Sequence, residues 1–170
     1  MARANNSSLE AWIAGTAAGD ADAFSRLYLE TGAAVYAYAL SILRNRYDAE
    51  DILHECYIAI RDKGSQYRPD TNPMAWIMTV TRNLCLQHLQ RQKRSAQLEE
   101  ICVADTSPDP DDKLIVEGCL LILSDEERQI VVLHNVAGFK HREIGAFMSL
   151  PLHTVITKYR RALKKMRDEF

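Results

Sequence analysis

Residues 106–112 read Thr106-Ser107-Pro108-Asp109-Pro110-Asp111-Asp112, and this short stretch decides how the rest of the chain is organised. Two prolines so close together do not continue a helix, because proline lacks the backbone N–H and its ring clashes with the preceding turn. The stretch also has no large apolar side chain to bury in a core. We therefore predict an acidic, flexible linker with a separate domain on either side.

The formal charge is distributed unevenly around this linker. Over all 170 residues it is −2, which on its own argues against nucleic-acid binding. Residues 1–94 carry 11 basic and 10 acidic side chains, residues 95–123 carry one basic and seven acidic, and residues 124–170 carry nine basic and six acidic. The near-neutral total is thus a cancellation, in which an acidic middle masks basic residues clustered at 82–94 and 153–167.

On both sides of the linker, apolar residues recur at helical spacing, and no segment alternates with period two. The chain has only seven glycines and five prolines, so chain-breaking residues are few. We predict an all-α protein of two small helical domains, residues 1–94 and 114–170, joined by the acidic flexible linker at 95–113. The second domain is expected to contain a helix-turn-helix.

Local signals place the helix ends in the first domain. Apolar stripes occupy residues 9–17, 24–28 and 35–42, and Asp48 is a plausible N-cap for the helix that follows. Asn72 and Pro73 form an N-cap with proline at the first helical position, which predicts the start of a long helix.

In the second domain, Ser124 and Glu127 have the spacing of a capping box. The helix that they begin is predicted to stop at Ala137-Gly138, and a short helix is predicted over 142–148. A turn at 149–151 leads into a last, strongly basic helix. Two helices joined by a short turn, the second basic, are typical of a DNA-binding helix-turn-helix.

Several classes of chemistry find no support in the sequence. The N-terminus lacks the apolar core of a signal peptide, and the longest apolar stretch, residues 114–123, is too short to cross a bilayer. The four cysteines include no C-x-x-C pair and are expected to be buried or half-buried thiols, so the predicted location is the cytoplasm. No catalytic motif is present, so we predict no enzymatic activity, catalytic residue, metal site or cofactor.

Motifs in both domains carry a family resemblance. In the first domain they are Gly19-Asp20-Ala21-Asp22-Ala23-Phe24, Ala49-Glu50-Asp51-Ile52-Leu53-His54-Glu55, Ala75-Trp76-Ile77, Arg82-Asn83-Leu84 and Arg91-Gln92-Lys93-Arg94. In the second they are Gly138-Phe139, Arg142-Glu143-Ile144, Pro151-Leu152-His153-Thr154-Val155 and Arg161-Ala162-Leu163-Lys164-Lys165. In this order and spacing, the motifs resemble the extracytoplasmic-function (ECF) group of bacterial RNA polymerase sigma factors.

The resemblance implies a dissociable subunit that directs RNA polymerase to specific promoters and initiates transcription. Its implied partners are promoter DNA, the clamp of the largest polymerase subunit, the flap of the second-largest subunit and an anti-sigma factor, with no insertion into a membrane. The alternative is a sigma-like mimic or partner-switching protein that binds an anti-sigma factor without reading DNA. The basic clusters in both domains argue against that alternative.

The resemblance and the side-chain chemistry together select three sets of residues. The set for the core polymerase is an acidic helix face: Asp48, Asp51, His54 and Glu55. The set for the minus-ten element combines phosphate-binding cations with candidates for a pocket that holds a flipped base: Tyr67, Asn72, Arg82, Asn83, Arg91, Lys93 and Arg94. The set for the minus-thirty-five element lies on the last helix: His153, Thr154, Ile156, Thr157, Lys158, Arg160, Arg161, Lys164 and Lys165.

The second domain departs from the family pattern at four positions. Ile156 replaces a usual Lys or Arg, and His153 replaces a small residue. Lys140 stands where Ser or Thr caps the short helix, which removes a cap worth about 1 kcal/mol, although Glu143 can still accept its half of the capping bonds. Gly145 replaces Ala and is expected to cost up to ~1 kcal/mol of helix stability. The promoter sequence therefore does not follow from the family.

Overall fold

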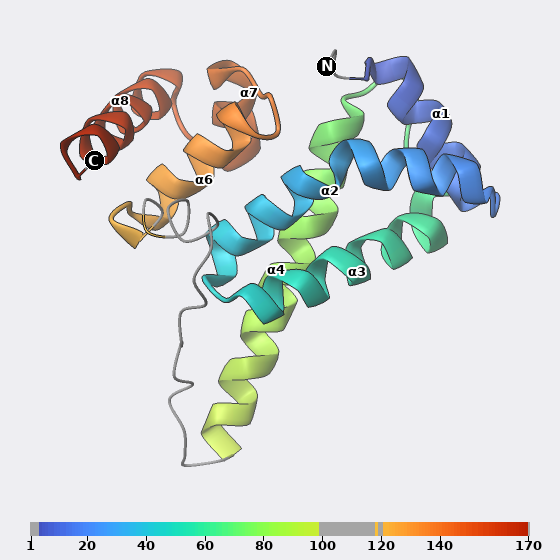
Figure 1. Ribbon diagram of the computed structural model, residues 1–170, viewed down its shortest axis with the longest axis horizontal. Helices are drawn as coiled ribbons and strands as arrows, with labels where there is room; N and C mark the ends of the chain where they lie inside the picture. The colour runs from blue at the N-terminus through green and yellow to red at the C-terminus, as the bar shows by residue number, and fades with distance from the viewer. Residues whose placement is uncertain (1–3, 99–117, 119–120, 170) are drawn as a thin grey trace. The chain divides into compact units, whose positions relative to one another are not determined.

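We describe the protein from a computed structural model, in which residues 4–98, 118 and 121–169 are described. The chain forms two compact units, Met1–Gln90 and Arg91–Phe170. Every regular element among the described residues is helical, which confirms the predicted all-α class. Figure 1 shows the helices of each unit.

The first unit begins with three α-helices packed against one another, α1 (Asn6–Ala17), α2 (Ala21–Leu43) and α3 (Arg46–Lys63). A short 3-10 helix, η1 (Gly64–Gln66), follows α3, and a loop leads into the long helix α4 (Pro73–Leu98), whose last eight residues lie beyond the boundary at Gln90. The shared core contains side chains with no exposed surface: Ile13, Leu27, Val35, Ile52, Ile60 and Ile77. Cys85 of α4 packs with Ala39, Ala49 and Ile52, which joins α4 to α2 and α3.

Two apolar stripes merge into one helix, and one predicted helix start was wrong. The stripes at 24–28 and 35–42 belong to one helix, α2, because Gly32 continues it in a buried position against Tyr28 and Tyr57. The next helix begins at Arg46, and its N-cap is Asn45, whose Oδ1 accepts a hydrogen bond from the Asp48 backbone N–H (3.1 Å). Acidic residues are favoured both at the N-cap and at the third position of a helix. Asp48 occupies the third position, which explains why the sequence predicts it as the cap.

The predicted start of α4 is confirmed. The Asn72 side chain accepts a hydrogen bond from the Ala75 backbone N–H (3.1 Å), and Pro73 occupies the first helical position. The helix then continues to Leu98, four residues beyond the expected end of the first domain at Arg94.

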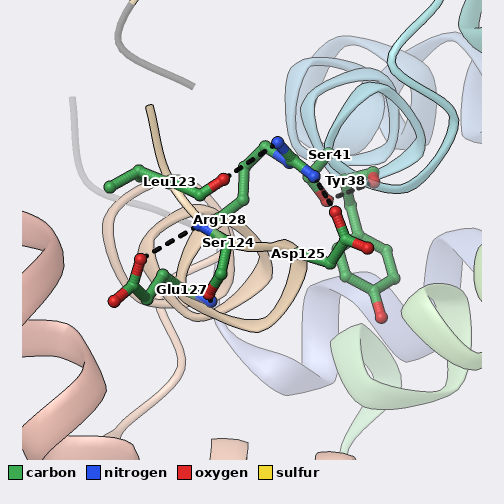
Figure 2. Close-up of polar contacts among 7 residues, drawn as sticks. All are labelled: Tyr38, Ser41, Leu123, Ser124, Asp125, Glu127 and Arg128. Carbon is green, nitrogen blue, oxygen red and sulfur yellow. Dashed lines mark hydrogen bonds and ion pairs between the residues drawn. The ribbon is translucent and has the colours of Figure 1, made fainter. Parts of the chain in front are cut away.

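The second unit contains α6 (Asp125–Asn135), α7 (His141–Met148) and α8 (Leu152–Glu169). Its core is formed by Ile130, Leu133, Ile144, Val155 and Ala162, which come from all three helices. The predicted capping box is confirmed: Ser124 Oγ accepts from the Glu127 N–H (3.3 Å), and Glu127 Oε2 accepts from the Ser124 N–H (3.0 Å). Figure 2 shows this start of α6, where the Arg128 guanidinium donates to the Leu123 carbonyl (3.2 Å) and contacts Asp125.

The two cysteines among the described residues are buried thiols, as expected. Burial raises the pKa of Cys56 to about 11 and that of Cys85 to about 12, so both thiols are protonated at neutral pH. Cys102, Cys119 and nearly all of the predicted linker at 95–113 lie outside the described residues. No helix in the described part of the chain is long and apolar enough to cross a membrane.

Candidate nucleic-acid and polymerase interfaces

The turn between α7 and α8 fixes the direction of the last helix. Ser149 adopts a left-handed backbone conformation (φ 56°), and the Leu150 N–H donates to the Gly145 carbonyl (2.9 Å). The Pro151 carbonyl then accepts from the N–H groups of Thr154 (3.0 Å) and Val155 (3.1 Å), which starts α8. These bonds satisfy the backbone through the turn, so α7 and α8 form a well-defined helix-turn-helix.

We call the solvent-facing side of α8 its outer face. Five polar side chains of the predicted minus-thirty-five set are exposed there: His153, Thr157, Arg160, Arg161 and Lys164. Thr154 and Ile156 flank this face and are half-buried. The opposite side of the helix buries Val155 and Ala162 in the core. The outer face therefore combines short polar groups near the N-terminus of α8 with cations further along it.

Two lysines of the predicted DNA-binding set point elsewhere. Lys158 Nζ lies 2.8 Å from Glu126 Oε2, and its side chain is 26% exposed. Lys165 Nζ lies 2.7 Å from Glu127 Oε2, and that glutamate is only 3% exposed. Both acids belong to the first turn of α6, so these two lysines join α8 to α6. In this conformation Lys158 is therefore half-buried and ion-paired.

The start of α7 is capped from one side only, as predicted. Glu143 Oε2 accepts a hydrogen bond from the Lys140 backbone N–H (2.7 Å), but the Lys140 side chain makes no capping bond. Against the propensity cost expected for Gly145 stands a steric reason for glycine at this position. A Cβ atom at this position would lie 2.8 Å from the Leu150 carbonyl oxygen, so glycine allows the turn to approach α7 closely.

A cluster of three rings lies between α6, α7 and α8. The imidazoles of His134 and His141 are stacked, with centroids 4.4 Å apart, and the Tyr159 ring lies 4.8 Å from each of them. His134 Nδ1 is 2.7 Å from the Phe139 carbonyl oxygen, so this nitrogen carries a proton. Burial lowers the pKa of His141, and the nearby charges of His134 and Arg160 act in the same direction.

The predicted polymerase-binding residues share one side of α3. Asp51 and His54 are exposed, whereas Asp48 and Glu55 are half-buried at the edges of that side. Asp48 Oδ2 lies 3.3 Å from His88 Nε2 of α4, so Asp48 also connects two helices. The opposite side of α3 buries Ile52 and Cys56 in the core, as the sequence predicts.

The predicted minus-ten residues on α4 form two groups, one in the middle of the helix and one towards its end. Asn83 is exposed and Arg82 is half-buried, while Arg91, Lys93 and Arg94 are all exposed towards the end of the helix. Burial raises the pKa of Tyr38 in α2, and the positive charge of Arg82 partly opposes this shift. Arg82 therefore lies close enough to α2 to influence a core tyrosine.

The loop before α4 differs most from the expectation. Tyr67 is only 8% exposed, with its ring edge-on to Trp76 (centroids 5.6 Å apart). Its hydroxyl donates to Glu10 Oε1 of α1 (2.7 Å) and approaches the Thr71 carbonyl oxygen (3.1 Å). Tyr67 therefore does not present a free ring for base stacking in this conformation. Sequence reasoning missed Glu10, since 57 residues separate it from Tyr67 and no local motif marks it.

Comparisons with known proteins match both units. Residues 27–95 match the family model described as Sigma-70 region 2, and residues 113–166 match Sigma-70, region 4. The ECF RNA polymerase sigma factor SigK of Mycobacterium ulcerans is 26% identical over 172 residues, which cover 94% of this chain and 92% of the relative. The RNA polymerase sigma factor CarQ of Myxococcus xanthus is 26% identical over 157 residues, which cover 88% and 90%.

Solved structures share the fold. The sigma factor RpoE, crystallised with the anti-sigma factor NepR from Bartonella quintana, gives a TM-score of 0.71 at 20% identity, with coverage of 85% of this chain and 94% of that one. CnrH, in complex with the cytosolic domain of CnrY, gives a TM-score of 0.67 at 23% identity, with coverage of 95% and 96%.

The two family-model matches, on helical units of which one holds a basic helix-turn-helix, place the chain in the class of transcription initiation factors. The chain belongs to the sigma-70 family, and within it to the ECF group of sigma factors. It is a sigma subunit that directs RNA polymerase to promoters, and proteins of this kind are not enzymes.

Proposed function

We propose that this sigma subunit reads the minus-thirty-five element with the outer face of α8. The observation that carries the proposal is the separation of charges on this helix. Lys158 and Lys165 are paired with acids of α6, whereas Arg160, Arg161 and Lys164 are exposed on the outer face. A helix that presents cations on one side, with polar groups at its N-terminus, suits the major groove.

Within this face we assign different roles along the helix. The N-terminal residues contact base edges, and the cations beyond them contact phosphates. Ile156 is half-buried beside His153 and Thr157, and its apolar side chain suits a thymine methyl group. Lys158 and Lys165 can contact DNA only by leaving their glutamate partners for a phosphate group. We therefore expect each of them to contribute less to DNA affinity than Arg161.

The salt dependence of promoter binding tests this assignment. In holoenzyme, Arg161→Ala should lower the slope of log affinity against log salt concentration by about 0.9, because one phosphate contact is lost. Arg26→Ala removes an exposed cation from α2 in the other unit and serves as the matched control. An unchanged slope for the Arg161, Arg160 and Lys164 variants would contradict the assigned face.

We further propose that α4 and the loop before it act on the minus-ten element. The exposed cations Arg91, Lys93 and Arg94 suit phosphates, and Arg82 and Asn83 lie further back on the same helix. Loop residues Tyr67 to Asn72 would shape the site for a base taken out of the stack. Asn72 contributes mainly by capping α4, through its bond to the Ala75 N–H.

For the polymerase, we propose that the acidic side of α3 docks on the clamp of the largest subunit, while the second unit contacts the flap of the second-largest. Asp51→Lys combined with Glu55→Lys should abolish copurification with core polymerase, because the reversed charges repel a basic surface. Asp22→Lys with Glu30→Lys makes the same charge change on exposed positions of α2 and is the control. Retained copurification of the α3 double variant would contradict this docking surface.

We also propose an anti-sigma partner and a cytoplasmic location, where core polymerase works. Support comes from RpoE and CnrH, which share the fold and were solved with NepR and with the cytosolic domain of CnrY. In vitro transcription with core polymerase, using genomic DNA to map start sites, identifies the promoters and distinguishes a sigma subunit from the mimic alternative. A mimic would bind its partner protein and produce no specific transcripts.

A further inference from the structure

One carboxylate joins the first helix of the protein to the loop that precedes α4. Glu10 Oε1 accepts a hydrogen bond from the Tyr67 hydroxyl (2.7 Å) and a second from the Asp70 backbone N–H (3.0 Å). The two donors lie at opposite ends of a four-residue stretch. A single oxygen therefore fixes both the buried aromatic residue of the loop and its exposed tip.

The donor at the tip has an uncommon backbone conformation. Asp70 is left-handed (φ 63°), which few non-glycine residues adopt, although Asp does so more readily than most. Inside the loop, Thr71 Oγ1 donates to the Arg68 carbonyl (2.8 Å), which closes a local turn. The bond to Glu10 connects that turn to a helix, and so restricts where the turn lies relative to the start of α4.

The beginning of the same segment also rests on α1. A Cβ atom at Gly64 would lie 3.0 Å from Ala17 Cβ and 3.1 Å from the Ile13 carbonyl oxygen, so η1 approaches α1 closely. Tyr67 is then held between Glu10 on one side and the Trp76 ring on the other. Contacts with α1 thus fix the segment from Gly64 to Asp70 at both ends.

Glu10 lies outside the part of the unit that matches the family model. The Sigma-70 region 2 match begins at residue 27, whereas α1 spans Asn6–Ala17. The family match therefore says nothing about Glu10. Its part in the loop follows only from its bonds in this protein.

We propose that Glu10 is a positioning residue for recognition of the minus-ten element, acting by holding the loop 67–72 in its binding conformation. This inference rests on the proposed role of the loop in capturing a flipped base. Loops that are ordered before binding lose less conformational entropy when they bind, and a small displacement of contact groups weakens recognition strongly. Removing the carboxylate should therefore weaken base discrimination and leave phosphate contacts and polymerase docking intact.

The test uses holoenzyme on a promoter taken from the mapped start sites. Each minus-ten position of the non-template strand is replaced in turn by an abasic site, and the loss of open-complex affinity is measured. In the wild type, one position should show a large loss. In Glu10→Ala the abasic site should reduce open-complex affinity by about tenfold less than in the wild type, because one charge-assisted hydrogen bond contributes roughly that factor. The slope of log affinity against log salt concentration should stay the same. Glu10→Gln should restore most of the discrimination, because its amide oxygen can accept the same two bonds.

Two further variants make the result decisive. Glu30→Ala, on α2, also removes a carboxylate that accepts a backbone N–H, that of Ala4 (2.7 Å), and should behave as wild type. Tyr67→Phe keeps the ring and removes only the hydroxyl, so it can replace Glu10→Ala in the test if that variant fails to fold. It should reduce base discrimination less than Glu10→Ala does.

The outcomes separate the two hypotheses. Wild-type holoenzyme that discriminates no minus-ten position would overturn the loop's proposed function and this inference together. Clear discrimination in the wild type, matched by Glu10→Ala and Tyr67→Phe, would overturn only the role of Glu10.

Discussion

Lys165 shows how one side chain can serve the fold although its charge suggests DNA binding. Its ammonium group neutralises Glu127, which is nearly inaccessible to solvent and also closes the capping box of α6. The hydrogen bonds of Glu127 to Lys165 and to the Ser124 N–H lower its pKa, although burial opposes the shift. A buried carboxylate that loses its cation keeps the cost of desolvation without compensation.

We therefore predict that Lys165→Ala destabilises the second unit by about 1–3 kcal/mol. The neighbouring exposed cation provides the control, since Lys164→Ala should change stability by less than about 0.5 kcal/mol and weaken promoter binding instead. Chemical denaturation and promoter binding of the two variants measure the two effects. Equal stability of both variants would show that the ion pair adds nothing to folding.

Gly145 gives a second prediction at the level of one residue. Helix propensity alone predicts that Gly145→Ala stabilises α7 by up to ~1 kcal/mol. The added methyl group would instead meet the Leu150 carbonyl oxygen at 2.8 Å, a backbone atom that moves only if the turn opens. We expect net destabilisation of about 1 kcal/mol or more, measured by thermal or urea unfolding. A stabilised variant would show that the turn relaxes at little cost.

We predict that the ring cluster of His134, His141 and Tyr159 makes the helix-turn-helix sensitive to acid. Burial first, and then the charges of His134 and Arg160, lower the pKa of His141 below its ordinary 6.5 in the folded protein. A group whose folded pKa is lowered binds protons more readily in the unfolded chain. Its contribution to stability is therefore present above pH 6.5 and is lost as the pH falls through the folded pKa.

Hydrogen exchange measured on peptides from residues 125–169 of the whole chain tests this prediction. Protection of α7 and α8 should fall between pH 7 and 5, after correction for the intrinsic pH dependence of exchange. In His141→Gln, which keeps a planar polar side chain, this fall should be smaller. The prediction fails if wild type and variant lose protection equally over that range.

At the level of elements, the local signals predicted what depends on local contacts. The capping box at Ser124 and the Asn72-Pro73 start need only residues three or four positions apart, and both are confirmed. Gly32 lies within α2 against Tyr57 of another helix, and the role of Gly145 depends on a turn that folds back on it. The bonds of Glu10 and Lys165 join residues 57 and 38 positions apart, which no local pattern reveals.

At the scale of the whole molecule, acidic and basic side chains are concentrated in different segments of the chain. Its net charge of −2 contains a middle segment, residues 95–123, with seven acidic side chains and one basic, between segments with exposed cations on α4 and α8. We predict that in the free protein the acidic segment competes with phosphates for those cations, because opposite charges that come within a Debye length of about 10 Å attract one another at moderate salt. The composition thus predicts weaker DNA binding by the free protein than its basic faces alone would give.

Neutralising the acidic segment tests this idea. Asp109→Asn, Asp111→Asn and Asp112→Asn together change the whole-chain charge from −2 to +1. Affinity of the free protein for duplex DNA should rise by roughly threefold or more at low salt, and the gain should shrink as salt screens the attraction.

A control with Asp22→Asn, Glu30→Gln and Asp62→Asn makes the same charge change on exposed positions of the first unit. Fluorescence anisotropy should show the larger gain for the linker variant, since the competing acids must lie where they can reach the cations. An equal gain in DNA affinity for both variants would show that only the net charge matters. No gain for either variant would show that the acidic segment acts only as a spacer.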